Sequence, residues 1–320
     1  MRRLILSCIT AGIFWLVACN DEFQPVAGYS DRLAVVSILS NQSDTQYVRV
    51  NTTYNAYGQD DANPDHPVVN ASVYLTDGTK LYAFRDTVIR SWSDSGSVML
   101  KTFIAPGAKL TLGKTYSLVV SSPGLGTVTA STAVPGAGLI STTDDLKLKE
   151  PFLYDNTTEM VFIAQMTGQT KGYIVRLYLD YELAVPGVGW NPVRMEIPTS
   201  LLEYTDIENY LGIYPSIAVK RSSGVSTERV IFHIDVYKKL IKGLRSRYKP
   251  GDINFKTFTM EMYQYEENLY KYYSIATGFR DQFSIRTDLP NYSNISGGVG
   301  LFGAYTKSFQ VIALPDNIGL

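Results

Sequence analysis

The stretch YVRVNTTY at residues 47–54 alternates apolar and polar side chains. Val48, Val50 and Thr52 fall on one face of an extended chain, and Arg49 falls on the other. Alternation with a period of two is typical of a strand that buries one face and exposes the other. The stretch therefore predicts a β-sheet that covers an apolar core.

Short strands of this kind recur on both sides of residues 47–54, with turn signals such as Asp77-Gly78 between them. About seven short strands in roughly 105 residues predict a β-sandwich of immunoglobulin-like type over residues 31–137. The expected strands are 33–39, 47–54, 71–76, 80–84, 98–104, 115–121 and 127–134.

Glycine and aspartate residues between 135 and 151 indicate a domain boundary. We expect residues 145–320 to form a second, larger β-rich domain, a sandwich or a barrel-like form. Its expected strands are 160–166, 173–183, 194–197, 230–234, 255–265 and 309–314, and its expected helices lie near 205–211, 235–247 and 266–277. The first helix rests on a capping-box pattern at residues 205–208, and the second on an apolar stripe at helical spacing. The predicted fold class is all-β with a few short helices.

Composition narrows the classes of function. The 29 basic and 30 acidic residues give a net charge of -1, which argues against nucleic acid as a partner. Two cysteines and two histidines exclude a zinc finger, an iron–sulfur cluster and a disulfide framework. No nucleophile–base set is recognisable, so the sequence predicts no catalytic residue, no metal, no cofactor and no enzymatic activity.

The first residues carry the pattern of an export signal. Arg2 and Arg3 precede a mostly apolar run from 4 to 17 that is too short to span a bilayer. The run ends in Leu16-Val17-Ala18-Cys19, which resembles the bacterial lipobox. The resemblance implies cleavage of residues 1–18 and attachment of a diacylglycerol to Cys19. Residues 19–30 contain Pro25 and Gly28 and lack periodicity, which predicts a flexible tether. The alternative is an ordinary signal peptide that happens to contain a cysteine.

Acidic residues follow Cys19 directly. Asp21 and Glu22 resemble the surface-export signal of lipoproteins from the Bacteroidetes group. The resemblance implies a chain anchored by its acyl chains in the outer membrane and facing the cell surface. The alternative is a solvated tether on a protein that faces the periplasm.

Two further patterns resemble ligand sites. Residues 298–303 match the G-x-G-x-x-G pattern, but a nucleotide site needs a helix after it, and residues 304–314 are β-patterned. A glycine-rich bend where strands approach closely is the better interpretation. The acidic run at 60–67, which ends in His66-Pro67, could hold calcium or a transition metal, although a solvated loop fits it better.

Aromatic residues give the remaining candidates. Trp92 and Trp190 stand among small and polar residues, which predicts exposed loop positions and the largest exposed aromatic rings. Exposed loop aromatics can stack on sugars or anchor a protein partner. A second group, Tyr263, Tyr265, Tyr270, Tyr272 and Tyr273, is interpreted as core and strand-face packing.

With these features in this order, the sequence resembles a known family, the Bacteroidetes lipoproteins with domain of unknown function 4249. The matching pieces are the cysteine at 19, the strand 33–39, residues 69–78, residues 112–118, the strand and helix 260–275, and the glycine-rich tail 294–304. The family implies a surface or periplasmic lipoprotein that is often encoded near TonB-dependent transporters. It carries no catalytic residues that could be transferred to this chain.

The sequence therefore predicts a lipid-anchored binding or accessory protein of the outer membrane. Its expected partners are the membrane and either a TonB-dependent transporter or a surface glycan. The alternative is a structural or adhesive surface protein, such as a pilus-like or matrix component, in which an exposed edge strand would be offered for pairing.

Overall fold

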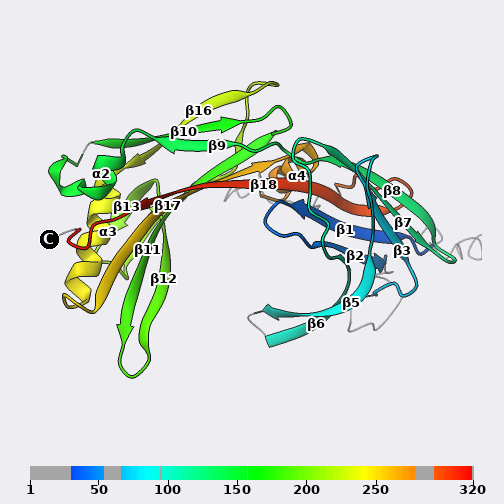
Figure 1. Cartoon of the computed structure of the whole chain (residues 1–320), viewed down its shortest axis with the longest axis horizontal. Helices are drawn as coiled ribbons and strands as arrows, with labels where there is room; N and C mark the ends of the chain where they lie inside the picture. Colours follow the sequence, from blue (N-terminus) through cyan, green and yellow to red (C-terminus); the bar gives the residue numbers. More distant parts are fainter. Residues whose placement is uncertain (1–29, 54–65, 94–95, 157, 278–291, 319–320) are drawn as a thin grey trace, which may run out of the picture.

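The computed structural model describes residues 30–318 except 54–65, 94–95, 157 and 278–291. Strands predominate and helices are few and short, so the predicted all-β class is confirmed. The molecule is an arch whose two limbs end in the β11–β12 and β5–β6 hairpins (Figure 1).

One long sheet runs through the whole arch. Its strand order is β12-β11-β17-β18-β1-β2-β6-β5, with short β15 paired to β11. The strands are β12 (Gly189–Ile197), β11 (Gly172–Val185), β17 (Ile253–Tyr265), β18 (Val299–Ala313), β1 (Leu33–Ser40), β2 (Gln46–Thr52), β6 (Gly96–Ala105), β5 (Arg85–Ser93) and β15 (Ala218–Val219).

Smaller sheets and helices cover parts of this sheet. They are a four-stranded sheet of β4 (Leu81–Ala83), β3 (Ser72–Thr76), β7 (Thr115–Ser122) and β8 (Gly126–Ala133), a three-stranded sheet of β16 (Ser226–His233), β10 (Glu159–Met166) and β9 (Leu139–Thr142), the hairpin of β13 (Ser200–Tyr204) and β14 (Tyr210–Ile213), and the helices α2 (Asp145–Lys149), η1 (Pro151–Leu153), α3 (Ile234–Arg247) and α4 (Glu267–Thr277).

Two apolar cores form between these layers. Alternate side chains of β1 and β2 face the four-stranded sheet, so that Val48 and Val50 are buried as the alternation predicts. The second core lies between β11 and β17 on one side and the three-stranded sheet with α3 on the other, and Phe162 of β10 stacks on Phe258 of β17 there at 6.0 Å.

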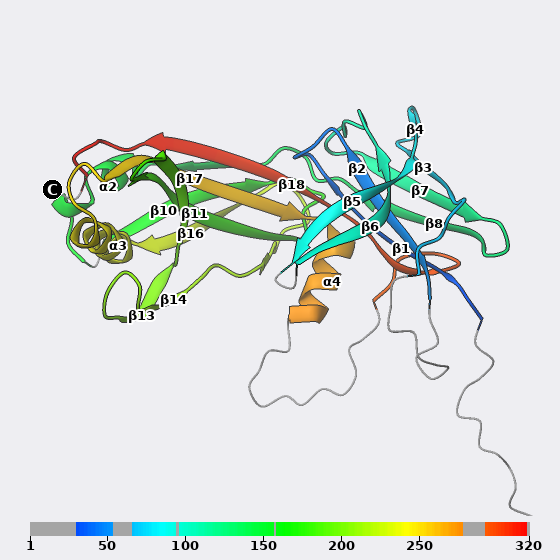
Figure 2. The same cartoon turned by 90° about the horizontal axis from the view of Figure 1, so that it is seen from below.

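Strand β18 contributes to both cores. Its first half pairs in parallel with β1 and supplies Phe302 to the first core, whereas its second half pairs with β17 and supplies Ile312 to the second. The division of the chain at residues 137–145 stays a prediction. The long sheet nevertheless crosses that division, because the fifteen-residue strand β18, red in Figure 2, joins its two halves.

The glycine-rich tail lies where the chain comes closest to its neighbour. Gly300 has φ +125°, and a Cβ atom built on it would lie 2.0 Å from the carbonyl oxygen of Val35. A side chain there would collide with the backbone of β1, so only glycine fits. The predicted close approach of strands is confirmed, and β18 continues as a strand where a nucleotide site would need a helix.

Two of the three predicted helices are confirmed, as α3 and α4. The helix expected near 205–211 is wrong, because residues 205–209 form the turn between β13 and β14, and β14 begins at Tyr210. The side chain of Asp206 accepts hydrogen bonds from the backbone N–H groups of Glu208 and Asn209, at 2.8 and 2.9 Å. An aspartate that satisfies these donors locally favours a turn over a helix.

Candidate functional site

The residues predicted for export and anchoring lie outside the described part of the chain. They are Leu16, Val17, Ala18 and Cys19 of the lipobox, and Asp21 and Glu22 after it. Most of the acidic run, residues 60–65, also lies outside it. Within the described residues, no cluster of histidine, cysteine and carboxylate side chains could hold a metal ion, and no helix is long and apolar enough to cross a membrane.

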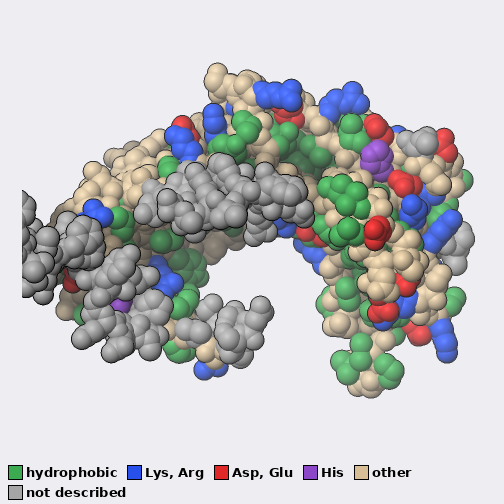
Figure 3. All heavy atoms as spheres, turned by 180° about the vertical axis from the view of Figure 1, so that it is seen from behind, with side chains coloured by type: hydrophobic (Ala, Val, Ile, Leu, Met, Phe, Trp, Pro, Cys, Tyr) green, Lys and Arg blue, Asp and Glu red, His purple; other side chains and the backbone are tan. Residues whose placement is uncertain are grey.

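Both tryptophans lie in strands, so their predicted loop positions are wrong. Trp92 stands opposite Ser97 in the β5–β6 hairpin, and its side chain lies outside the described part. Trp190 stands opposite Ala184 in the β11–β12 hairpin, where 49% of it is exposed, as expected. Figure 3 shows hydrophobic side chains gathered at the free end of this limb, where Val188 is also exposed. The structure does not bring the two tryptophans together, because the two hairpins are at opposite ends of the long sheet.

A different group of side chains forms the candidate site. It occupies the face of β12, β11, β17 and β18 that points away from the three-stranded sheet, which we call the open face. The alternation of each strand sends apolar side chains into the core and polar or aromatic ones to this face. Its members are Arg176, Tyr178, Asp180, Arg194, Glu196, Thr257, Thr259, Glu261, Tyr263, Tyr265, Tyr305, Lys307 and Phe309.

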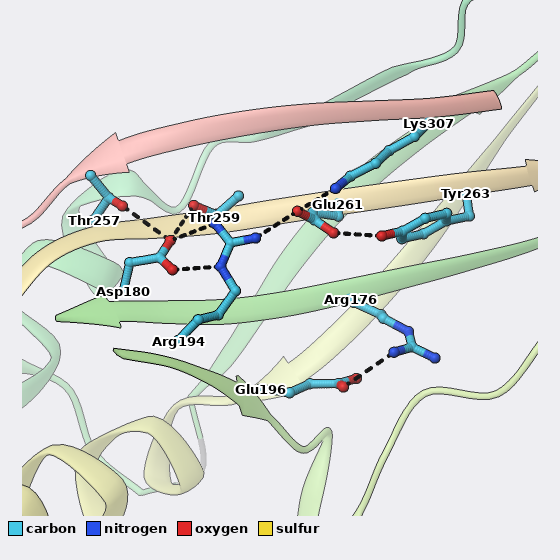
Figure 4. A network of polar contacts seen from close by, with 9 residues as sticks. All are labelled: Arg176, Asp180, Arg194, Glu196, Thr257, Thr259, Glu261, Tyr263 and Lys307. Carbon is cyan, nitrogen blue, oxygen red and sulfur yellow. Dashed lines mark hydrogen bonds and ion pairs between the residues drawn. The ribbon is translucent and has the colours of Figure 1, made fainter. Parts of the chain in front are cut away.

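Asp180 and Arg194 form the best-defined contact on the open face (Figure 4). They are opposite each other on β11 and β12, and the guanidinium donates to both carboxylate oxygens, at 2.6 and 3.1 Å. Thr259 adds a hydrogen bond of 2.7 Å to the same carboxylate. Burial raises the pKa of Asp180, but the hydrogen bonds from Arg194 and Thr259 outweigh it, so the pKa lies below its usual value. The carboxylate is therefore ionised at neutral pH.

Glu261 is the second anchor of the network. Only 4% of it is exposed, and its carboxylate lies 2.9 Å from Arg194 Nη1 and 2.6 Å from Lys307 Nζ (Figure 4). The hydroxyl of Tyr263 donates to its other oxygen at 2.8 Å. Removing any of these three partners would leave a buried charge less well compensated, which is costly, so the carboxylate favours keeping both cations beside it.

A further ion pair, Arg176 with Glu196 at 3.3 Å, extends the network along β11 and β12. Burial raises the pKa of Glu196, and the neighbouring Arg176 opposes that rise. Three cations thus balance three carboxylates across the open face. The network provides fixed donors and acceptors on a rigid sheet, and Arg194 remains 49% exposed at its surface.

Aromatic rings line the same face beside the charges. Tyr305 lies 6.0 Å from Tyr263 and 6.3 Å from Tyr265, and Tyr265 meets Tyr273 of α4 at 5.8 Å. Burial, and the neighbouring hydroxyl of Tyr273, raise the pKa of Tyr265 to about 12, so its hydroxyl stays a donor at any physiological pH. These tyrosines are partly exposed, which fits the predicted strand-face packing rather than a fully buried core.

Phe309 is the most exposed aromatic residue of the site. It stands opposite Glu261 on β18, and 67% of it is accessible, more than the 49% of Trp190. The expectation that the tryptophans would be the most exposed aromatic rings is therefore wrong for Trp190, and for Trp92 it stays a prediction. An exposed phenylalanine beside a charge network provides an apolar surface next to hydrogen-bonding groups. Small-molecule binding sites combine these two kinds of surface.

Sequence reasoning missed this face as a site, although part of its signal is visible. The alternation of Arg176, Tyr178 and Asp180 with buried Val175 and Leu177 marks β11 as two-sided. The register of β11 with β12 and β17 determines which charged side chains come into contact. That register cannot be predicted from the sequence of a single strand.

The fold and the open face define an all-β protein with a polar and aromatic sheet surface. The family model described as Domain of unknown function (DUF4249) matches residues 20–310, and the chain belongs to that family. No curated protein matches the chain. Among solved structures, the C-terminal globular domain of oligosaccharyltransferase from Pyrococcus abyssi is similar over 74% of this chain and 49% of that one, at 12% identity. Its TM-score of 0.25 supports no argument about fold or function, and the chain spans about half the length of that structure.

Proposed function

We propose that this protein binds a glycan on its open face and does so as a lipid-anchored protein of the bacterial outer membrane, exposed at the cell surface. The exposed ring of Phe309 beside the fixed charges of Arg194 and Lys307 is the observation that carries the proposal. A sugar ring presents an apolar face and a rim of hydroxyl groups. The open face offers a matching aromatic plane and a rim of donors and acceptors on a rigid scaffold.

The anchoring part of the proposal rests on the sequence. The run from 16 to 19 supplies the cysteine that would carry the acyl chains, and Asp21 and Glu22 supply the surface-export pattern. A protein held at the surface in this way would concentrate a glycan near a TonB-dependent transporter. Replacing Cys19 by alanine should release the protein from the membrane fraction. A variant that stays in the membrane after a high-salt wash would remove the anchoring part.

A glycan array tests the binding part. The full-length protein should bind a subset of glycans, and Phe309→Ala should weaken that binding about tenfold, which corresponds to 1.4 kcal/mol. Leu81→Ala is the matched control, because Leu81 is also 67% exposed but lies on β4 of the other sheet. Binding that both variants reduce equally, or that neither reduces, would refute the open face as the site.

The second candidate is a structural or adhesive role, which the end of the long sheet favours. Strand β5 has nine residues and pairs only with β6 within the described part of the chain. An unpaired edge of this length can accept a strand from another molecule. Proline at Ile89 would block such pairing, so a loss of cell–cell adhesion in Ile89→Pro with unchanged glycan binding would favour this role over the first.

A further inference from the structure

A second site lies away from the open face, at the junction of the two cores. A cavity of about 540 Å³ opens between strand β8, the turn 168–171, the segment 220–223 and the start of α4. Figure 1 shows α4 beside β8, and the side-chain amide of Asn268 donates to the carbonyl oxygen of Ser131 across this junction at 3.3 Å. None of the residues that line the cavity belongs to the open face.

Lys220 is the unusual residue of this cavity. Only 3% of it is exposed, and its ammonium group has no hydrogen-bond partner among the described residues. Lys171 and Arg221 line the same cavity, and neither forms an ion pair within the described part of the chain. Burying an ammonium group without a partner is costly, and a second cation nearby adds to that cost. Burial, and then the charge of Lys171, lower the pKa of Lys220.

The carboxylates of the cavity form no ion pair with these cations within the described part of the chain. Glu266 accepts hydrogen bonds from the backbone N–H groups of Asn268 and Leu269, at 2.8 and 2.7 Å, and so closes the first turn of α4. Glu267 pairs with Lys271 along the helix at 2.6 Å. Glu266 is therefore held by the helix, and Glu267 by Lys271, although the charge of Lys171 also helps to lower the pKa of Glu267. Lys220 and Arg221 have no carboxylate partner within the described part of the chain.

Hydrogen bonds fix the main chain of the two lysines that line the cavity. The N–H of Lys171 donates to the carbonyl of Tyr265 at 2.8 Å, and the N–H of Lys220 donates to the carbonyl of Lys171 at 2.9 Å. Thr170 donates to the buried side chain of Gln264 at 2.9 Å, which fixes the adjoining turn. The backbone of Lys171 is thus held by the end of β17, and the backbone of Lys220 by Lys171, so both residues have fixed places on the cavity wall.

We propose that this cavity binds the anionic group of a small hydroxylated molecule, such as the carboxylate of a sugar acid, with Lys220 as its principal partner. The anion would supply the hydrogen-bond partner that the buried ammonium group lacks among the described residues. Such charge-assisted hydrogen bonds are stronger than those between neutral groups. The hydroxyl groups of Thr115, Ser131, Ser222 and Ser223 line the remaining wall and match a hydroxylated body.

Calorimetric titration of the full-length protein with D-glucuronate, glucose 6-phosphate and uncharged D-glucose tests this proposal. At least one of the two anions should bind, and at least tenfold more tightly than glucose. Lys220→Met keeps the length of the side chain and removes the charge, and should weaken that binding at least tenfold. Lys249→Met is the control, because Lys249 is exposed, follows α3 and does not line the cavity. This variant should bind the anion as tightly as the unmodified protein.

Without ligand, Lys220→Met should melt at a higher temperature than the unmodified protein, because the substitution removes an unpaired buried charge. This measurement also checks that the variant folds. Arg221→Gln is a second variant at an exposed position, and it should also weaken anion binding. Anion binding that is unchanged in both variants, or no binding of either anion at millimolar concentration, would overturn the proposal. Phe309→Ala should not affect this titration, so the failure of one site is distinguishable from the failure of the other.

Discussion

Replacing Gly300 by alanine tests the joint that holds the two halves of the long sheet together. Gly300 lies in β18 with φ +125°, a conformation that costs an alanine about 1–2 kcal/mol. The new Cβ atom would lie 2.0 Å from the carbonyl oxygen of Val35, and relief of that collision requires β1 and β18 to separate locally. Overpacking of this kind costs about 1–3 kcal/mol more.

We therefore expect Gly300→Ala to lower the free energy of unfolding by about 2–5 kcal/mol. Gly78→Ala is the matched control, because Gly78 has φ +84° and no atom within 4 Å of a built Cβ. It bears the conformational cost alone, about 1–2 kcal/mol. Urea unfolding followed by circular dichroism measures both. If Gly300→Ala costs no more than Gly78→Ala, the close approach of β1 and β18 is not what this position requires.

Three further predictions concern the second core and the open face. Asp180→Asn should lower the unfolding free energy by about 1 kcal/mol at pH 7, because Asp180 loses its charge pairing with Arg194. Since the pKa of Asp180 is lowered in the fold, this loss should be full above the ordinary value of 3.8 and vanish as pH falls through the lowered one; a loss that persists in strong acid would contradict it. Leu240→Ala, at a fully buried position of α3, should cost about 2–5 kcal/mol in urea unfolding, and a cost below 1 kcal/mol would contradict its place in the core. Trp190→Ala should cost less than Leu240→Ala in the same assay, because 49% of Trp190 is exposed, and an equal or larger loss would contradict its partly exposed position.

Strands with clear alternation were predictable because their pattern is local. Residues 47–54 predicted β2, and the stripe of Tyr237, Leu240 and Leu244 predicted α3, whose buried face contains all three. Strand β5 was not expected, because Arg85 to Ser93 mixes charged and apolar residues with most described side chains exposed or half-buried. A hairpin at the end of a sheet needs little burial to form once its partner strand is in place.

The helix expected at 205–211 failed for a different reason. A capping-box pattern and a turn use the same residue types, because Ser, Thr and Asp side chains accept hydrogen bonds from nearby backbone N–H groups in both. Here the side chain of Asp206 does so within the turn. The pairing of Ser200 with Ile213 across the hairpin decides between them. That pairing joins residues outside the pattern, so the pattern alone could not reveal it.

The candidate site depends on contacts between residues far apart in the sequence. Arg194 reaches Glu261 across 67 positions, and the parallel pairing of Ala34 with Val299 joins the two ends of the described chain. No local periodicity specifies such contacts. The sequence could show that single strands had a polar and aromatic face, but not that four of them would present these faces side by side.

A crystal structure of the full-length protein with a glycan selected on the array tests the central claim most directly. Our account predicts that a sugar ring lies against Phe309 or Tyr305 on the open face, with its hydroxyl groups within hydrogen-bond distance of Arg194 or Lys307. A glycan bound on the outer surface of the β4-β3-β7-β8 sheet, with the open face bare, would contradict the account.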